Sequence, residues 1–336
     1  MKAPFPWFGG KSRVAHLVWD RIGNVPNYVE PFFGSGAVLL ERPWPAQTES
    51  VNDLDCMVAN FWRALQHDPE GVAEAADNPV NEADQHARHL WLCSAEDFRE
   101  RMKTEPEFYD AKIAGWWVWG QCIWIGAGWC ARQLPHLGNA GKGLNRQLPH
   151  LGDAGTGVQE SDLTSGTLAR GQILAYMRAL AERIRKVRVC CGDWSRLCGP
   201  SVTIKHGITG VLLDPPYADE ADRTDNLYAS DSGSVAHAVA AWALEWGEHR
   251  DMRIALCGYE GEHAIPASWE CVEWKARGGY GSQGNGSGRE NAGRERIWFS
   301  PHCLRPKQGL FSELMGLAMR DADEAAERYL IDNAND

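Results

Sequence analysis

The chain has 336 residues, of which 44% are hydrophobic and 24% are charged, and its formal net charge is −11. These values are typical of a soluble globular protein with one large domain and an insertion, or with two domains. No apolar run reaches the roughly 20 residues that cross a bilayer, the N-terminal segment lacks the apolar region of a signal peptide, and the ten cysteines form no CxxC pair. We therefore expect a cytoplasmic protein with reduced thiols, no contact with membranes and no metal site.

The N-terminal segment PWFGGKS (Pro6–Ser12) ends like a phosphate-binding P-loop. A Walker A loop needs a glycine five residues before Gly10, where this chain has Phe5, and no strand precedes the segment. An NTPase is therefore disfavoured. Taken alone, the segment is also typical of a Gly-Gly turn that carries a solvated lysine. Ser12 is a suitable N-cap for a helix that runs to about Val18.

Short apolar runs bounded by turn residues predict six strands, and helical patterns lie between several of them. One such helix follows the N-cap Ser234 and carries Val235, Val239, Trp242 and Trp246 on one face. Alternating strands and helices indicate a mostly parallel α/β sheet. The predicted strands are Tyr28–Glu30, Ser50–Asn52, Val187–Cys191, Val211–Leu213, Arg253–Cys257 and Arg296–Phe299.

The stretch YVEPFFGSGAVLL (Tyr28–Leu40) predicts a strand, a tight glycine turn and the start of a helix, which Gly36 opens. This arrangement lets backbone N–H groups approach a ligand closely. Asp53 follows 17 residues after Gly36, where a carboxylate can bind the hydroxyls of a ribose. The pair favours a nucleoside cofactor over a plain turn. A dinucleotide fingerprint would have glycine or alanine at Leu39, so a nicotinamide cofactor is disfavoured.

Residues 60–186 interrupt the alternation and predict an inserted, mainly helical domain. They contain a direct repeat, RQLPHLGNAGKG at 132–143 and RQLPHLGDAGTG at 146–157, which we interpret as two similar loops. A tryptophan-rich run precedes the repeat. Large aromatic side chains at these positions are more typical of a core than of a base-stacking platform, although the sequence leaves both possibilities open. The tryptophans are Trp116, Trp117, Trp119, Trp124 and Trp129.

Charge is unevenly spread, which matters for nucleic acids because local patches decide where a phosphate backbone docks. Residues 132–188 contain nine basic and four acidic side chains, whereas residues 214–273 contain three basic and thirteen acidic ones. Arginine can pair with guanine and glutamine with adenine in the major groove. The repeat therefore predicts a DNA contact through Arg132, Gln133, Arg146 and Gln147, although two surface loops without contact fit equally well.

The segment LLDPPY (Leu212–Tyr217) places a carboxylate, two prolines and an aromatic ring directly after a buried strand. Transfer to the exocyclic amine of a base needs acceptors for its hydrogens and negative charge near the developing positive charge. Asp214 supplies the carboxylate, and Pro215 supplies a carbonyl whose direction Pro215 and Pro216 fix through their φ angles. Tyr217 supplies a face on which the base can stack. A strand-ending turn with a capping aspartate would also have this pattern.

The C-terminal part contains a glycine-rich segment, Gly278–Arg296, and an acidic end, Ser312–Asp336. The first is typical of a connector, although a loop that closes over phosphate also fits. The second predicts an acidic surface helix or tail.

Three motifs in this order resemble the D12 class, or Dam-like class, of N6-adenine DNA methyltransferases. WFGGK (Trp7–Lys11) is similar to the W-x-G-G-K opening of that class, EPFFGSG (Glu30–Gly36) to its S-adenosylmethionine loop, and DPPY (Asp214–Tyr217) to its catalytic motif. The resemblance covers roughly 4–65 and 187–301. The class often has Asp where this chain has Glu30, which keeps a carboxylate but changes its reach.

The resemblance implies a Rossmann-like S-adenosylmethionine-dependent methyltransferase sheet. Its catalytic domain would comprise 1–59 and 187–311, with a target-recognition domain at 60–186 and an acidic helix or tail at 312–336. It also implies roles for single residues: Asp53 would bind the cofactor ribose, and Asp193 its adenine, with Trp194 beside it. The cofactor-binding set that it implies is Trp7, Gly9, Lys11, Glu30, Pro31, Phe33, Gly34, Gly36, Asp53, Asp193, Trp194 and Asp214, and the catalytic set is Asp214, Pro215, Pro216 and Tyr217.

The expected activity is transfer of a methyl group from S-adenosylmethionine to N6 of an adenine that has rotated out of double-stranded DNA, by an enzyme that acts as a monomer. N4-cytosine transfer uses similar chemistry and stays open, whereas C5-cytosine transfer would need a Pro-Cys pair that the chain lacks. Three competing hypotheses are a dinucleotide-dependent oxidoreductase on a similar fold, a non-catalytic DNA-binding regulator, and a methylase of RNA or of a protein amide. The sequence does not predict the recognition site or a partner restriction enzyme.

Overall fold

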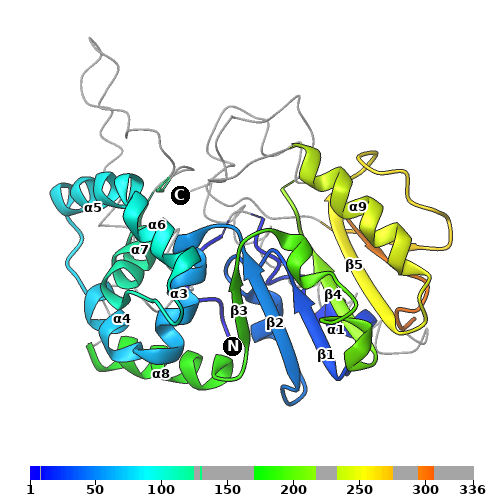
Figure 1. The fold of residues 1–336 in the computed structure, drawn as a ribbon, viewed down its shortest axis with the longest axis horizontal. Coiled ribbons are helices and arrows are strands. Elements are labelled where there is room, and N and C mark those ends of the chain that lie inside the picture. The colour runs from blue at the N-terminus through cyan, green and yellow to red at the C-terminus, as the bar shows by residue number, and fades with distance from the viewer. Residues whose placement is uncertain (8, 125–128, 131–169, 217–232, 275–293, 306–336) are drawn as a thin grey trace, which may run out of the picture. The chain divides into compact units, whose positions relative to one another are not determined.

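A seven-stranded sheet forms the centre of the computed structural model (Figure 1). The structure describes residues 1–7, 9–124, 129–130, 170–216, 233–274 and 294–305. The strand order is β3-β2-β1-β4-β5-β7-β6, in which the first five strands are parallel to one another and β7 is antiparallel to both β5 and β6. The strands are β1 (Asn27–Glu30), β2 (Thr48–Asp53), β3 (Arg188–Cys191), β4 (Thr209–Leu213), β5 (Met252–Tyr259), β6 (Glu270–Glu273) and β7 (Glu295–Phe299).

All six predicted strands are confirmed, each within a few residues of its expected bounds. The apolar side chains of the central strands are almost fully buried, as expected for parallel strands covered on both faces. The sequence prediction missed β6, which pairs only with β7 at the edge of the sheet. Its side chains alternate between half-buried and exposed, so no apolar run marks it.

Helices cover both faces of the sheet. The helices are α1 (Ala15–Ile22), α2 (Ala37–Leu40), α3 (Cys56–His67), α4 (Pro69–Ala76), α5 (Glu82–Ser94), α6 (Glu96–Thr104), α7 (Ala111–Ile123), α8 (Arg170–Ile184) and α9 (Gly233–Gly247), with short 3-10 helices η1 (Trp194–Leu197) and η2 (Ile204–His206). Side chains alternate along each strand, so that Tyr28 and Leu212 join one hydrophobic cluster while Val29 and Val211 join the other. Helices α1 to α8 contribute to the first cluster, and α9 and η1 to the second.

Two helix starts differ from the sequence prediction. Helix α1 begins at Ala15 with Val14 as its N-cap, so the prediction that Ser12 caps this helix is wrong. Residues 12–14 form turns instead, in which Val14 donates its N–H to the Lys11 carbonyl at 3.0 Å. Helix α9 begins at Gly233, so Ser234 lies within its first turn rather than before it.

The predicted helical insertion is α-helical where the structure describes it. Helices α3 to α8 pack on one another beside β2 and β3, and α3 spans the expected boundary at residue 60 (Figure 1). Trp117, Trp119 and Trp129 are buried, so the core interpretation is confirmed for these three, while Trp116 and Trp124 are partly buried. The predicted repeat at 132–157 lies outside the described residues.

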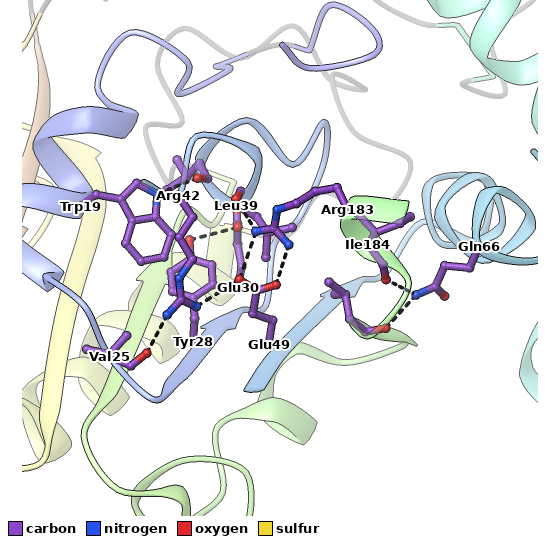
Figure 2. A network of polar contacts seen from close by, with 12 residues as sticks. Trp19, Val25, Tyr28, Glu30, Leu39, Arg42, Glu49, Gln66, Arg183 and Ile184 are labelled. Carbon is purple, nitrogen blue, oxygen red and sulfur yellow. Dashed lines mark hydrogen bonds and ion pairs between the residues drawn. The ribbon is translucent and has the colours of Figure 1, made fainter. Parts of the chain in front are cut away.

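A buried polar network connects helix α8 to the sheet (Figure 2). The carboxylate of Glu49 on β2 binds two guanidinium groups, that of Arg42 at 3.0 Å and that of Arg183 on α8 at 2.7 Å. Arg183 also donates to the carbonyl of Leu39 in α2 at 2.8 Å. A carboxylate that is 2% exposed is stable in this position because two cations and several hydrogen bonds compensate for its lost hydration. Among the helices that the structure describes, none has the length and apolar character to cross a membrane.

Candidate active site

The candidate site lies at the carboxyl edge of the parallel strands, where β1 is flanked by β2 on one side and β4 on the other. Strands β1 and β4 pair in parallel with Val29 opposite Val211, so the loop after Glu30 and the residue Asp214 leave the sheet side by side. Ligands of open α/β sheets bind at such a point, where the connections of neighbouring strands diverge to opposite faces. The topology therefore brings the predicted glycine loop and the predicted catalytic motif to one edge.

The loop 31–36 is held by the end of β2. Phe33 donates its N–H to the Asn52 carbonyl at 2.9 Å, and the Asn52 side chain donates to the Pro31 carbonyl at 3.1 Å. Gly34 donates its N–H to Oδ2 of Asp53 at 2.9 Å. Each bond fixes one segment of the loop, so its shape is set before any ligand binds.

Glycine is required at Gly34 and Gly36 because both have positive φ angles, +47° and +67°. A Cβ at Gly34 would lie 2.4 Å from the indole nitrogen of Trp7, and one at Gly36 would lie 2.7 Å from the ring of Phe33. Trp62 on α3 donates its indole N–H to the Gly34 carbonyl at 3.0 Å. The predicted Trp7 segment and the predicted glycine loop are therefore in direct contact.

Asp53 lies at the end of β2, as the ribose interpretation requires. Its Oδ1 accepts the N–H of Asp55 at 2.9 Å while Oδ2 binds Gly34. Burial raises the pKa of Asp53 to about 7, and the neighbouring carboxylate of Asp55 adds to the rise, although backbone hydrogen bonds oppose it. Once it is ionised, the Asp53 carboxylate is a strong acceptor for hydroxyl groups.

Glu30 is 4% exposed and lies beneath the loop rather than in it. Its Oε2 accepts the hydroxyl hydrogen of Tyr28 at 3.0 Å, and the backbone of Leu39 also hydrogen-bonds to it (Figure 2). Burial raises the pKa of Glu30 well above its ordinary value, and Asp214 and Glu49 contribute to the rise. This geometry fits a residue that supports the loop from inside the core.

Asp193 and Trp194 follow β3, next to the end of β2. The side chain of Asn52 donates to the Gly192 carbonyl at 2.9 Å, which joins the two strand ends. Asp193 is exposed and accepts the N–H of Ser195 at 3.0 Å, so it caps η1. The Trp194 ring stacks on Phe32 with 6.3 Å between the ring centres.

Lys11 and Asp214 form the central contact of the site. Lys11 Nζ lies 2.9 Å from Oδ2 of Asp214 and donates to the carbonyl of Gly9 at 2.7 Å. Lys11 is 4% exposed, and burial lowers its pKa, but the carboxylate of Asp214 and other nearby groups more than offset this effect and leave the pKa above its ordinary value. The ammonium group therefore stays charged and fixes the carboxylate at the end of β4. Pro215 is buried and Pro216 is partly buried.

Two polar side chains near Lys11 were not predicted from the sequence. Glu295 begins β7 and is 6% exposed, and burial raises its pKa to about 7, with Lys11 lowering it and Asp214 raising it. Trp274 follows β6, and Lys11 Nζ lies 5.3 Å from the centre of its ring. The period-two pattern of the closing strand is the signal that could have located Glu295, because it shares a face with the buried Ile297 and Phe299.

Some predicted site residues are not described by the structure. Tyr217 of the catalytic motif lies outside the described residues, as do Arg132, Gln133, Arg146 and Gln147. Their roles stay predictions. Among the described residues, no group of three or more histidine, cysteine, aspartate or glutamate side chains could hold a metal ion.

The seven-stranded mixed sheet, with this site at its carboxyl edge, is consistent with a methyltransferase fold. Residues 7–112 match the family model of D12 class N6 adenine-specific DNA methyltransferases. The resemblance based on the motifs is therefore confirmed for that segment, which includes Lys11, the glycine loop and Asp53. The match supports a DNA methyltransferase, and it ends before Asp214. A search of curated proteins found no match to the chain.

Proposed function

We propose that this protein is a site-specific DNA methyltransferase that transfers a methyl group from S-adenosylmethionine to N6 of adenine in duplex DNA. The observation that carries the proposal is the contact between Lys11 and Asp214 at the edge where the Gly34 loop also ends. Lys11, the Gly34 loop and Asp214 come from three different sequence motifs, so motifs that are far apart in the chain meet at this edge of the sheet.

The residues at the edge suit S-adenosylmethionine. Asp53 offers a carboxylate for ribose hydroxyls. The positive φ angles at positions 34 and 36 favour glycine, so no side chain at these positions blocks the approach of a ligand to the loop backbone. Asp193 and Trp194 lie at the next strand end, where we place the cofactor adenine. Asp214 suits a cationic sulfonium because opposite charges attract strongly where water is scarce.

The proposed chemistry needs no covalent enzyme intermediate. When bound, S-adenosylmethionine would supply an electrophilic methyl group on a sulfonium leaving group, and N6 would release its surplus proton to solvent. Asp214 accepts one amine hydrogen, and the Pro215 carbonyl accepts the other, which favours the tetrahedral nitrogen of the transition state. Lys11 keeps the Asp214 carboxylate in this orientation, and we propose that Tyr217 stacks on the base.

The remaining parts of the proposal concern DNA. We infer that residues 60–186 recognise the target sequence, with Arg132, Gln133, Arg146 and Gln147 in contact with the duplex. We also propose that the enzyme acts as a monomer in the cytoplasm. The family match supports a DNA substrate, whereas these finer assignments follow from the sequence patterns.

Tritium transfer from methyl-labelled S-adenosylmethionine to duplex DNA tests the proposal. The wild type should label DNA, and D214A should label it at least about a thousandfold more slowly, also when S-adenosylmethionine is saturating. Labelling of RNA or protein in place of DNA, oxidation of NAD(P)H in place of transfer, or near-normal turnover by D214A would contradict the proposal.

A further inference from the structure

The edge of the sheet has an unexplained polar row beyond Asp214. Tyr259 on β5 lies opposite Glu295 on β7. On the other side of β7, Glu273 of β6 pairs with Arg296, so the next residue, Trp274, lies opposite Glu295. Trp274 donates its backbone N–H to the Glu295 carbonyl at 3.4 Å. Residues directly opposite in an antiparallel pair point to the same face. The three side chains therefore form one row, on the face that also carries Lys11.

Two polar atoms of this row have no partner among the described residues. They are Oε2 of Glu295 and Nε1 of Trp274, and their side chains are 6% and 9% exposed. A buried donor or acceptor without a partner costs free energy, and such atoms are uncommon in folded proteins. The described residues contain nine such atoms, and these two belong to side chains that interact with Lys11, the partner of Asp214. Their position beside the candidate site points to a ligand that supplies the missing partners.

The order of the strands indicates which ligand this is. Under the proposed function, Asp193, Asp53 and the Gly34 loop bind the cofactor at the ends of β3, β2 and β1, and the methyl group is transferred at Asp214 on β4. The next strands along the edge are β5, β7 and β6. The row therefore lies on the side of Asp214 away from the cofactor, where the target base must be.

We propose that Trp274 and Glu295 form a subsite for the ring of the target base, in which both side chains donate hydrogen bonds to ring nitrogens of adenine. The inference rests on the proposed function. Asp214 and Pro215 use both hydrogens of the amine, so the ring nitrogens N1 and N7, which are acceptors, need donors. The indole N–H of Trp274 is always a donor. The carboxyl group of Glu295 is a donor in its neutral form, which its burial and the nearby Asp214 favour.

The test combines variants of the protein with variants of the substrate. After the methylated site has been mapped, synthetic duplexes carry adenine, 1-deazaadenine or 7-deazaadenine at the target position. W274F should lower kcat/KM for the adenine duplex about tenfold and should cause no further loss with the analogue that lacks the contacted nitrogen. E295A should lower kcat/KM about tenfold or more, and E295Q, which keeps a donor, should stay within about threefold of the wild type. KM for S-adenosylmethionine should change less than about twofold in all three.

Matched controls separate contact from packing. Trp298 is an indole of similar burial on the opposite face of β7, and Glu273 is an exposed carboxylate on β6. W298F and E273Q should leave the pattern of substrate discrimination unchanged, whatever their effect on thermal stability. Equal losses of W274F with all three duplexes, or a change confined to KM for S-adenosylmethionine, would overturn the subsite. A wild type that transfers no methyl group to DNA would instead overturn the proposed function.

Discussion

The two halves of the carboxyl edge differ in how their polar groups are satisfied. On the side of β1 and β2, Asp53, Asn52 and the glycine loop bind one another through several hydrogen bonds, and Oδ1 of Asn52 is the buried side-chain atom of these groups that has no partner among the described residues. On the side of β7 and β6, Glu295 and Trp274 each leave a buried atom without a partner among the described residues. The first half is preorganised, which lowers the cost of ordering on binding. Under the proposed subsite, the second half would gain its missing hydrogen bonds when the target base binds.

Lys11 binds Asp214 at the end of β4, the strand that lies between the two halves, so the loss of Lys11 should have the largest effect of the substitutions considered below. K11M removes the cation that holds Asp214, and we expect transfer to fall about a hundredfold or more. R21M is the matched control, because Arg21 forms an ion pair with Glu270 at 2.8 Å and is similarly buried but lies away from the site. Steady-state kinetics of both variants check this. A K11M enzyme no slower than R21M would show that the ion pair is not part of the active site.

Gly34 tests the preorganised half. An alanine there would bring its Cβ within 2.4 Å of Trp7 and would also adopt a positive φ angle. We expect G34A to lower the free energy of unfolding by about 1–3 kcal/mol and therefore to unfold at a lower temperature. We also expect it to bind S-adenosylmethionine at least about tenfold more weakly. Gly261 also has a positive φ angle, +81°, but nothing lies within 4 Å of its Cβ position. G261A should therefore report the strain alone, and equal cofactor affinities for the two variants would contradict the assigned role of the loop.

Asp53 should make cofactor binding depend on pH. Its pKa of about 7 in the folded protein lies above its ordinary value of 3.8, so the folded state holds this proton more tightly than the unfolded state. The contribution of Asp53 to stability is therefore favourable at low pH and is lost as the pH rises from about 4 to 7. The ionised carboxylate is the better acceptor, so the affinity for S-adenosylmethionine should rise through pH 7.

Calorimetric titrations between about pH 5.5 and 8.5 check this expectation. D53N should bind about tenfold more weakly than the wild type at the upper end of this range, with a smaller difference at the lower end. D110N is the control, since Asp110 caps α7 through the N–H of Ile113. If the affinity of D53N for S-adenosylmethionine depended on pH in the same way as that of the wild type, a group other than Asp53 would be responsible for this dependence.

Much of the fold could be predicted from the sequence because buried parallel strands leave continuous apolar runs bounded by turns. Strand β6 has no such run, and α1 begins late because residues 12–14 turn after Lys11. Local motifs also located Asp53, Gly34 and Asp214. The ion pair of Lys11 with Asp214 and the row of Glu295 and Trp274 depend on which strands become neighbours, and a single sequence does not specify that order.

The most direct test of the central claim is mass spectrometry of nucleosides from DNA treated with the protein and S-adenosylmethionine. We expect N6-methyladenine with the wild type and none above background with D214A. N4-methylcytosine as the product, no methylated nucleoside at all, or an equal yield of N6-methyladenine from D214A would contradict the claim.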